Sequence, residues 1–514
     1  MTRRVAGLAL RVLAGVAATL ALLAGFVVWR LSAGPLSLDA LTPYVARSIA
    51  PPEAGLVARV DHTLLSLGPG GTLEILARGV HFARQDGGAE LSLPELAMGF
   101  SPGAALRGVL APTLIVLDGP ELRLERSADG TFRLDLGATG AEVGDWTRAL
   151  LKDLASPPTG RGPLGYLNEV AIRHAALTVD DRALGVAWHA ERADAILTRG
   201  ARAMSGKVAL IAIEPGGVEA ELRGGFTLAY GENRLAARVS FTGLKPALFA
   251  DAAPSLAPLR ALNLPLSGEV RLALDTATLR ISGAGCNLTF GAGALVHPAL
   301  EGGQLAIASG ELRAEYDPQA GRVSIERLGV DLGGPRAELS GTVAGVGAGI
   351  LAGAWPRAVD VAGDLRLSKV PADSLAGYWP EQLSPHSREW VTQHIHDGLV
   401  TEADARFGAH VDLDPDASKP VRVDTFAGTF AYRGLTVDYF KPLEPLRGVD
   451  GTATFDRAHL DLVPSSGRVK GVQLTGGAAK LTQLDTNDEQ IAMEFGVKGP
   501  LRDVLQVLDS KPLE

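Results

Sequence analysis

Beyond residue 55 the chain alternates apolar and polar residues with a period of two. In the segment ELRLER, Leu122 and Leu124 fall on one side and Arg123 on the other, and the segment TFRLDL repeats the pattern. Because successive side chains of a β-strand point to opposite faces, this period predicts strands with one apolar and one wet face. Turn sequences such as SADG and LGGP separate these segments, which is typical of antiparallel sheets and not of a doubly wound α/β enzyme.

Glycine, with 62 residues, is frequent without a collagen-like period, which indicates many tight turns between short strands. We therefore predict a mainly β fold, in which an N-terminal transmembrane helix precedes an elongated, repetitive antiparallel β-groove with a few short helices between modules. An ordinary sandwich core is the alternative for the apolar faces, because the period cannot tell a core from a ligand-binding surface. The candidate groove-lining residues are Leu122, Leu124, Phe132, Leu134, Val239, Phe241, Val270, Leu272, Val323, Ile325, Leu365, Leu367, Leu460 and Leu462.

Helical patterns interrupt the strands at regular places. Gly243, Lys369 and Gly499 each follow a strand-like segment and precede a proline and a short apolar helix, at a spacing of about 130 residues. This spacing predicts an internal repeat. The last helix would start another unit just before the sequence stops, so we expect the last module to be truncated at its C-terminus. The predicted organisation is a cytoplasmic basic segment (1–11), a transmembrane anchor (12–30), an N-terminal β module (31–140), a helical or linker segment (141–165), β modules at 166–265 and 266–383, and a last β module (384–514) that opens with a helix over 385–397.

The N-terminus predicts a membrane anchor. Three arginines within the first eleven residues precede an uncharged apolar run from Val12 to Trp29. As a helix with a rise of ~1.5 Å per residue this run would measure about 27 Å, close to the hydrocarbon thickness of a bilayer. The run is longer than that of a cleaved signal peptide, and the arginines favour a cytoplasmic N-terminus. The predicted anchor residues are Val12, Leu13, Leu20, Leu22, Leu23, Phe26, Val27 and Trp29.

Charge and cysteine content exclude several classes of protein. The formal net charge is −9, whereas a nucleic-acid partner requires a basic surface for its phosphates. The single cysteine, Cys286, excludes a disulfide within the chain, a thiolate zinc site and an iron–sulfur cluster. Within the segment GAGCNLTFGAG we predict it to be a small buried strand residue.

The segment YWPEQLSPHSREWVTQHIHDGLVTEADARF breaks the alternation and holds three of the ten histidines. On a helix, His394 and His396 would point about 200° apart, and His386 would lie two turns away. Metal ligands on one helix need i, i+3 or i, i+4 spacing, so we predict no metal site here. Ser384 suits a helix N-cap and Gly398 a left-handed stop, which predicts a helix that closes one β module and launches the next.

The remaining motifs do not indicate catalysis. Asp412, Asp414 and Asp416 have the spacing of a calcium loop, but Ala417 and Val423 replace its glycine and its glutamate. The glycine-rich run 341–355 lacks the G-x-G-x-x-G pattern, and the chain contains neither a phosphate-binding loop nor a G-x-S-x-G nucleophile elbow. We therefore predict no enzymatic activity and no cofactor, with an undetected periplasmic hydrolase as the alternative.

Several stretches carry a family resemblance. YWP (Tyr378–Pro380), P-x-x-R-x-W-V (Pro385–Val391) and DGLVTEADARF (Asp397–Phe407) follow one another in the chain. Supporting stretches are LRGVLAPTLIVLDGPELRLERSADG (Leu106–Gly130), LPLSGEVRL (Leu264–Leu272) and GTFAYRGLTVDYFKPLEPLRGVDGTATFD (Gly428–Asp456). In this order they resemble the AsmA-like superfamily, in particular bacterial envelope proteins of the YhdP type.

The resemblance implies a single-pass inner-membrane protein whose bulk lies in the periplasm and whose long β-groove has an apolar interior. It implies no catalytic residues, and it implies a longer parent chain, because such proteins are about twice this length. We expect the protein to bind lipid acyl chains along the groove and to move phospholipid between the inner and outer membranes. The expected partners are phospholipid and the inner membrane, with outer-membrane or periplasmic proteins as further candidates. The alternative is an envelope assembly scaffold that assists outer-membrane protein biogenesis by strand addition at a sheet edge.

Overall fold

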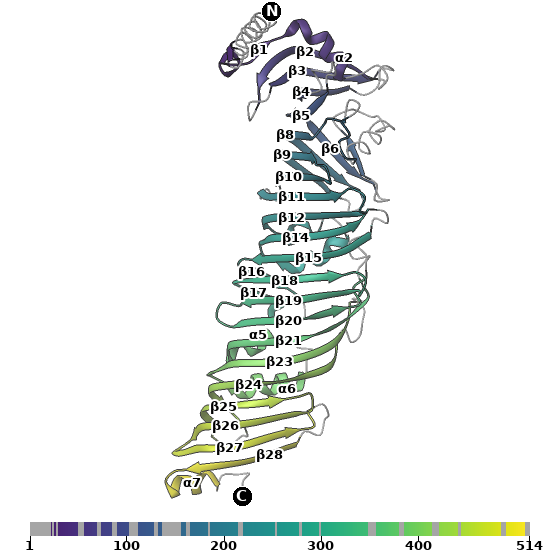
Figure 1. Ribbon diagram of the computed structural model, residues 1–514. Helices are drawn as coiled ribbons and strands as arrows, with labels where there is room; N and C mark the ends of the chain where they lie inside the picture. Colours follow the sequence, from purple (N-terminus) through teal and green to yellow (C-terminus); the bar gives the residue numbers. More distant parts are fainter. Residues whose placement is uncertain are drawn as a thin grey trace, which may run out of the picture. The chain divides into compact units, whose positions relative to one another are not determined.

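The structure is a computed structural model, and it divides into two compact units, Met1–Leu235 (unit 1) and Ala236–Glu514 (unit 2). Each unit is mainly β, as the alternation predicts (Figure 1). The residues that the structure describes are 22, 25–26, 29–49, 56–68, 73–84, 90–101, 111–127, 132–135, 156–160, 165–182, 186–213, 219–251, 254–276, 280–297, 300–347, 356–379, 385–413, 421–439, 444–484 and 490–508.

Unit 1 is built from strands that pair mostly with their neighbours in the chain. Antiparallel ladders join β1 through β5 in sequence order, and a second set joins β8 through β11. The elements are β1 (Leu36–Ser37), η1 (Asp39–Leu41), α2 (Thr42–Ile49), β2 (Leu56–Leu67), β3 (Leu73–Arg84), β4 (Glu90–Phe100), β5 (Pro112–Asp118), β6 (Glu121–Arg126), β7 (Phe132–Asp135), β8 (Glu169–Asp181), β9 (Val186–Arg199), β10 (Ala203–Ile213), β11 (Glu219–Ala229) and β12 (Arg234–Leu244), the last of which continues into unit 2.

Strand β8 departs from the predicted antiparallel arrangement. It pairs in parallel with β5, where Val116 lies opposite Ala171, and in parallel with β6, where Leu124 lies opposite Val179. The prediction of an antiparallel sheet throughout is therefore wrong at β8. Parallel neighbours need a crossover of about a dozen residues or more, and the chain between β7 and β8 is long enough for one. Alternating side chains report the faces of a strand and not its direction, so the period contained no signal for this pairing.

The helix α2 covers one face of the first strands of unit 1. Its Val45 is buried against Val60 of β2, Val80 of β3 and Leu96 of β4, and Ile49 packs at the border of the same cluster. Val45 and Ile49 are four residues apart, which places both side chains on one side of the helix. The start of the helix is fixed by polar contacts, because Thr42 Oγ1 donates to Thr63 Oγ1 at 2.9 Å.

Unit 2 is a meander of antiparallel strands. From β14 to β21, and from β23 to β28, each strand of the main sheet pairs with the next one, and β21 pairs with β23 (Figure 1). Strands β13, β16 and β17 form a small separate sheet. The elements after β12 are η3 (Pro246–Phe249), η4 (Pro254–Ala261), β13 (Leu262–Asn263), β14 (Leu266–Asp275), β15 (Arg280–Phe290), β16 (Gly293–Val296), η5 (Glu301–Gly303), β17 (Gln304–Ile307), β18 (Ser309–Asp317), β19 (Arg322–Asp331), β20 (Arg336–Ala344), β21 (Ala358–Pro371), η7 (Ala372–Ser374), α5 (Leu375–Tyr378), α6 (Pro385–His394), β22 (Ile395–His396), β23 (Leu399–Asp412), β24 (Val421–Val437), β25 (Leu446–Phe455), β26 (His459–Val469), β27 (Val472–Thr482), β28 (Gln490–Lys498) and α7 (Leu501–Leu508).

The helix predicted over 385–397 occupies Pro385–His394, so it ends three residues earlier than expected. The reason is that Ile395 pairs with Val437 of β24 and extends the chain as β22. Gly398 does adopt the left-handed conformation, with φ of 58°, but Asp397 precedes it with φ of 56°. The turn into β23 is therefore made by two left-handed residues. Ser384, the predicted N-cap, lies outside the described residues.

Tyr432 predicts a measurable pH dependence of stability. It is 6% exposed within a cluster that contains Leu435, Val449 and Ala453, and burial raises its pKa from 10.0 to about 12. Because the neutral phenol is the favoured form, its stabilising contribution is complete below pH 10 and is lost as the pH rises through 12. Two pKa units correspond to about 3 kcal/mol at ~1.36 kcal/mol per unit. Urea unfolding from pH 9 to 12, followed by a fluorescent probe in unit 2, should show a decline that is shallower by about 2 kcal/mol in Tyr432→Phe, and identical slopes in the two proteins would contradict the assignment.

Candidate functional site

One face of the main sheet of unit 2 carries rows of apolar side chains that run from strand to strand. Directly paired residues of neighbouring strands place their side chains on the same face. The leucine row consists of residues that the register pairs one after another from β15 to β28: Leu288, Leu312, Leu328, Leu339, Leu365, Ala405, Gly428, Phe455, Leu460, Leu481 and Ile491. At ~4.8 Å between strands, this row extends for about 50 Å along the sheet.

Three further rows lie beside the leucine row on the same face, because their members stand two or four positions from it along each strand, apart from register shifts at β-bulges. The cysteine row is Val270, Cys286, Ala314, Ile325, Gly341, Gly363, Phe407 and Phe426. The valine row is Leu272, Ala284, Tyr316, Val323, Val343, Val361, Ala409 and Val423. The alanine row is Val330, Ala337, Leu367, Ala403, Phe430, Ala453, Leu462, Ala479 and Met493. We call these four rows together the apolar face.

The structure therefore brings together the candidate groove residues of unit 2. All eight that lie on its main sheet from β14 onward fall within these rows: Val270, Leu272, Val323, Ile325, Leu365, Leu367, Leu460 and Leu462. Val239 and Phe241 of β12 lie on the same face as these rows. The reason is that Arg238, which precedes Val239, lies on the opposite face, where its Nε is 3.3 Å from Glu269 Oε1. Whether these residues contact lipid stays a prediction.

The candidates of unit 1 form a separate group. Leu122 is buried beside Ala175 and Ala193. Leu124 pairs with Val179 of β8 on one side and with Leu134 of β7 on the other. Phe132 pairs in register with Arg126, and its backbone position puts it on the same face of β7 as Leu134.

The predicted anchor is only partly described. Leu22, Phe26 and Trp29 are helical and exposed, and the rings of Phe26 and Trp29 lie 5.8 Å apart. Among the described residues no helix is long and apolar enough to cross a membrane. The other predicted anchor residues lie outside the described residues: Val12, Leu13, Leu20, Leu23 and Val27.

Burial distinguishes the apolar face from a sandwich core. Leu312, Leu339 and Leu365 are half-buried rather than enclosed, although they sit in the middle of the sheet. Cys286, which we expected to be a buried strand residue, is also half-buried in its row, and burial raises the pKa of its thiol. A second layer of structure would have enclosed these side chains. The middle of the apolar face is thus open enough to contact a ligand.

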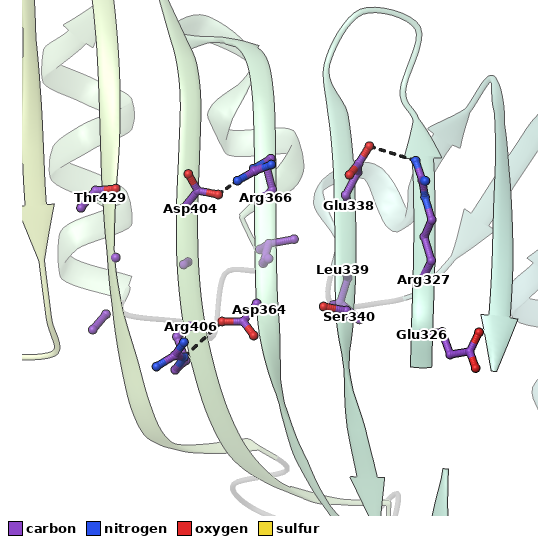
Figure 2. A pocket seen from close by; sticks show the side chains of 14 residues that line it. Glu326, Arg327, Glu338, Leu339, Ser340, Asp364, Arg366, Asp404, Arg406 and Thr429 are labelled. Carbon is purple, nitrogen blue, oxygen red and sulfur yellow. Dashed lines mark hydrogen bonds and ion pairs between the residues drawn. The ribbon is translucent and has the colours of Figure 1, made fainter. Parts of the chain in front are cut away.

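The opposite face of the same strands is charged. Arg366 Nε lies 2.7 Å from Asp404 Oδ1, Arg406 Nε lies 3.1 Å from Asp364 Oδ1, and Arg327 Nη2 lies 3.3 Å from Glu338 (Figure 2). The hydrogen bond to Asp404 raises the pKa of Arg366. These residues line a shallow hollow of about 660 Å³. The paired opposite charges on neighbouring strands support the register of β19 to β23. The charged side chains that line the hollow make it unsuitable for an apolar ligand.

Two glycines flatten the middle of the apolar face. Gly341 of β20 lies directly opposite Gly363 of β21. A Cβ atom at Gly341 would stand 2.3 Å from the carbonyl oxygen of Ala362, and one at Gly363 would stand 2.4 Å from that of Ser340. Only glycine fits at either position, so the cysteine row has a shallow section between Ile325 and Phe407. Sequence reasoning missed this pair, because the facing of two glycines becomes visible only once the register is known.

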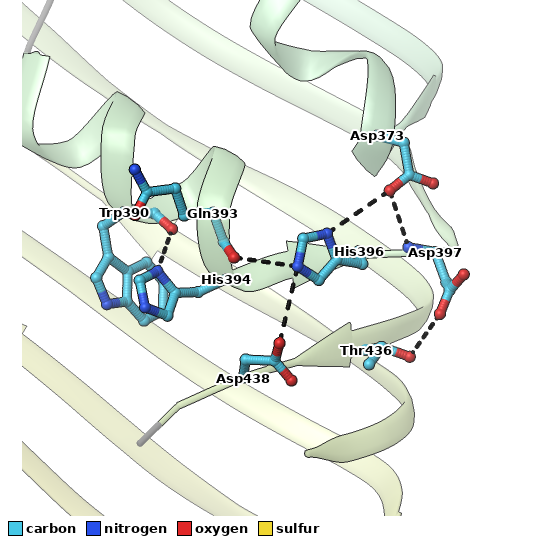
Figure 3. Close-up of polar contacts among 8 residues, drawn as sticks. All are labelled: Asp373, Trp390, Gln393, His394, His396, Asp397, Thr436 and Asp438. Carbon is cyan, nitrogen blue, oxygen red and sulfur yellow. Dashed lines mark hydrogen bonds and ion pairs between the residues drawn. The ribbon is translucent and has the colours of Figure 1, made fainter. Parts of the chain in front are cut away.

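The segment that joins β21 to β23 covers one end of the apolar face. Ala372 of η7 and Ile395 of β22 pack against the cluster of Tyr432, Leu435 and Ala453. Polar contacts hold this segment to the sheet, because Asp438 N–H donates to the carbonyl of His394 at 2.8 Å. Thr436 Oγ1 also donates to Asp397 Oδ2 at 2.8 Å (Figure 3).

Two of the three histidines of this segment have structural partners among the described side chains. His394 stacks on Trp390, with ring centroids 5.2 Å apart, and its Nδ1 lies 2.9 Å from the Trp390 carbonyl oxygen. His396 lies between Asp373 and Asp438, at 3.9 and 3.8 Å, and contacts the Gln393 carbonyl oxygen at 3.1 Å (Figure 3). In the described part of the chain no three His, Cys, Asp or Glu side chains are grouped as metal ligands.

Comparison with known protein families matches residues 303–514 to the family described as YhdP protein. The matched range starts at the last residue of η5 and contains β17 and the main sheet from β18 to β28, with most of the apolar face. Of the stretches that carry the resemblance, Tyr378–Phe407 and Gly428–Asp456 lie inside the match, whereas Leu106–Gly130 and Leu264–Leu272 lie outside it. Searches of curated proteins and of solved structures found no match.

Proposed function

Because residues 303–514 form a domain of the YhdP family, a family of bacterial envelope proteins, we propose that the apolar face binds lipid acyl chains and that the protein moves phospholipid between the inner and outer membranes. The observation that carries the proposal is the continuity of the leucine row, which joins β15 to β28 without a polar interruption. The half-burial of this row supports the proposal, because a ligand can reach it.

The energetics require such a surface. Two acyl chains of about 16 carbons each lose roughly 25 kcal/mol of hydrophobic stabilisation when they are transferred to water, at ~0.8 kcal/mol per methylene. A row of Leu, Val, Ala and Gly side chains keeps the chains covered while the head group stays in water. Its members are chemically alike from strand to strand, so a bound chain can move along the sheet without passing a deep well or a high barrier.

A second candidate function has its own observation. All nine residues of β28 are exposed, and its Ile491, Phe495 and Val497 are apolar. In the described part of the chain β28 pairs with β27 alone, so its other edge could accept a strand from a client protein. This favours the assembly scaffold, which would use backbone hydrogen bonds of the edge and not the apolar face.

Photo-crosslinking separates the two functions. A benzophenone amino acid at Leu365 lies in the leucine row, and one at Ala362 lies on the opposite face of the same strand. We expect phospholipid to be captured at Leu365 and not at Ala362 when the full chain is isolated from an envelope with two membranes. Equal capture at both positions would contradict a lipid-binding face, and capture of outer-membrane proteins at Ile491 without lipid at Leu365 would favour the scaffold.

A further inference from the structure

A patch at the start of unit 1 exposes apolar and cationic side chains close in sequence to the predicted anchor. Tyr44 of α2 is 67% exposed, Leu41 of η1 is 44% exposed and Leu36 of β1 is 36% exposed. Arg47, one turn after Tyr44, is exposed as well. We call Leu36, Leu41, Tyr44 and Arg47 the N-terminal patch. Aromatic and aliphatic side chains beside arginine are the composition of proteins that lie at a membrane–water interface.

The helix α2 has one side packed against the sheet and one side exposed. Val45 and Ile49 pack into the core over β2 to β4, whereas Tyr44 and Arg47, three residues apart, point outward and share one side of the helix. The outward side of the helix thus presents apolar surface as well as a charged group. A helix that met only water there would gain nothing from exposing Tyr44 next to Leu41.

The patch is held rigidly on the first strands. Leu38 N–H donates to the Thr63 carbonyl at 2.7 Å, and Thr63 N–H donates to Asp39 Oδ1 at 3.0 Å. The Thr63 hydrogen bond, followed by that of Ser37, lowers the pKa of Asp39. The carboxylate is the one acidic group of the segment 36–49. Its side chain is 53% exposed, accepts hydrogen bonds from Thr63 N–H and Ser37 Oγ, and lies 3.6 Å from His62 Nδ1, while Arg47 is exposed on α2. Arg47 is therefore the group of this segment that can pair with an anionic head group.

Distance also restricts what the patch can reach. Leu41 follows Trp29 by twelve positions, so even a fully extended chain would hold Leu41 within about 42 Å of the end of the predicted anchor. Part of this connection is already folded, because Gly34 N–H donates to the Leu31 carbonyl and Leu36 pairs with Leu65. The nearest large apolar environment to such a patch is the bilayer that holds the anchor.

We propose that the N-terminal patch docks on the surface of the membrane that holds the anchor, as a second membrane contact that fixes the orientation of strands β1 and β2 against the bilayer. The partner is a lipid surface with anionic head groups. The inference goes beyond the proposed function, and relies on it only for the consequence that lipid would enter the protein from a sheet held in a set orientation.

Fluorescence quenching in proteoliposomes tests the docking. The full chain, with Cys286→Ala and Tyr44→Cys, is labelled with a nitrobenzoxadiazole dye and reconstituted into vesicles of phosphatidylethanolamine and phosphatidylglycerol. Phospholipid that carries a spin label near the head-group end of its acyl chain should quench most of the emission, and the emission maximum should lie to the blue of that in detergent-free buffer. The matched control is Val57→Cys, which is 52% exposed on the face of β2 that points away from α2 and should show little quenching.

The outcomes are distinct. Equal quenching at positions 44 and 57, or none at 44, would overturn the proposal, and a blue shift without quenching would show a protein contact instead of lipid and would overturn it too. In the Tyr44→Cys chain, Arg47→Glu should lower the quenching by phosphatidylglycerol-containing vesicles, and an unchanged signal would remove the electrostatic part of the argument. Because the readout lies at α2, it is independent of lipid capture at Leu365. A quenched probe together with absent capture would retain the docking and reject the proposed function.

Discussion

Leu365→Asp should lower the amount of phospholipid that copurifies with the full chain at least ten-fold. Leu365 stands in the middle of the leucine row, paired with Leu339 on one side and Ala405 on the other. A bound acyl chain would exclude water from the new carboxylate, and burying an unpaired polar group costs about 2–7 kcal/mol, whereas ~1.4 kcal/mol already corresponds to a factor of ten in affinity. Quantitative mass spectrometry of the retained lipids measures the change.

The same substitution on the charged face is the control. Ala362→Asp introduces the same charge on the same strand, three residues away, at an exposed position, and should leave the retained lipid unchanged. Since Leu365 is half-buried, water can reach the aspartate in the lipid-free protein, so the thermal unfolding of both variants should resemble that of the parent. Lipid retention that is normal in Leu365→Asp, or lost equally in Ala362→Asp, would refute the apolar face as the binding surface.

The faces of the strands could be predicted from the sequence, because the alternation of side chains along a strand does not depend on which strands pair with it. Val323 and Ile325 lie on the same side of β19 whichever strand pairs with them, and the same holds for Leu365 and Leu367 of β21. This local property suffices to place eight candidate residues on one face of unit 2.

Pairing between strands is a non-local property, and here sequence reasoning failed. The register of β18 and β19 shifts between Arg313 and Ala314, which decides that Ile325 meets Ala314. The parallel contacts of β8 and the facing of Gly341 and Gly363 depend in the same way on which segments meet after a long connection. No single segment encodes these choices, because they minimise the free energy of the whole sheet.

The helix that opens the last module combines a local feature that could be predicted with a non-local one that could not. Its position followed from the loss of alternation and from the proline at residue 385, which suits a first helical turn. Its end did not, because Ile395 and His396 pair with Val437 and Thr436, residues about 40 positions later in the chain. Gly398 correctly predicted a left-handed turn, but it did not define the last helical residue.

Arg199→Leu should destabilise unit 1 by about 2–5 kcal/mol, the sum expected when one buried and one partly buried carbonyl group lose charged donors. Arg199 is 5% exposed at the end of β9. Its Nε and Nη2 donate to the Ser156 carbonyl at 3.2 and 2.8 Å, and its Nη1 donates to the Leu167 carbonyl at 3.0 Å. The guanidinium thereby ties the segment before β8 to the end of β9, and a leucine of similar bulk cannot replace any of these donors.

Hydrogen exchange of the β8 and β9 amides in the full chain measures this loss locally, where a single unfolding curve of a two-unit protein would not. Arg192→Leu, an exposed arginine on the same strand, is the matched control and should change exchange by less than about 0.5 kcal/mol. Arg199→Lys should fall between the two, because one ammonium group cannot span both carbonyls as the planar guanidinium does. If Arg199→Leu and Arg192→Leu exchanged alike, Arg199 would be a surface residue in solution. The attachment of Leu167 and Asn168 to β9 would then come from backbone contacts, such as the 2.7 Å hydrogen bond from Arg199 N–H to the Asn168 carbonyl.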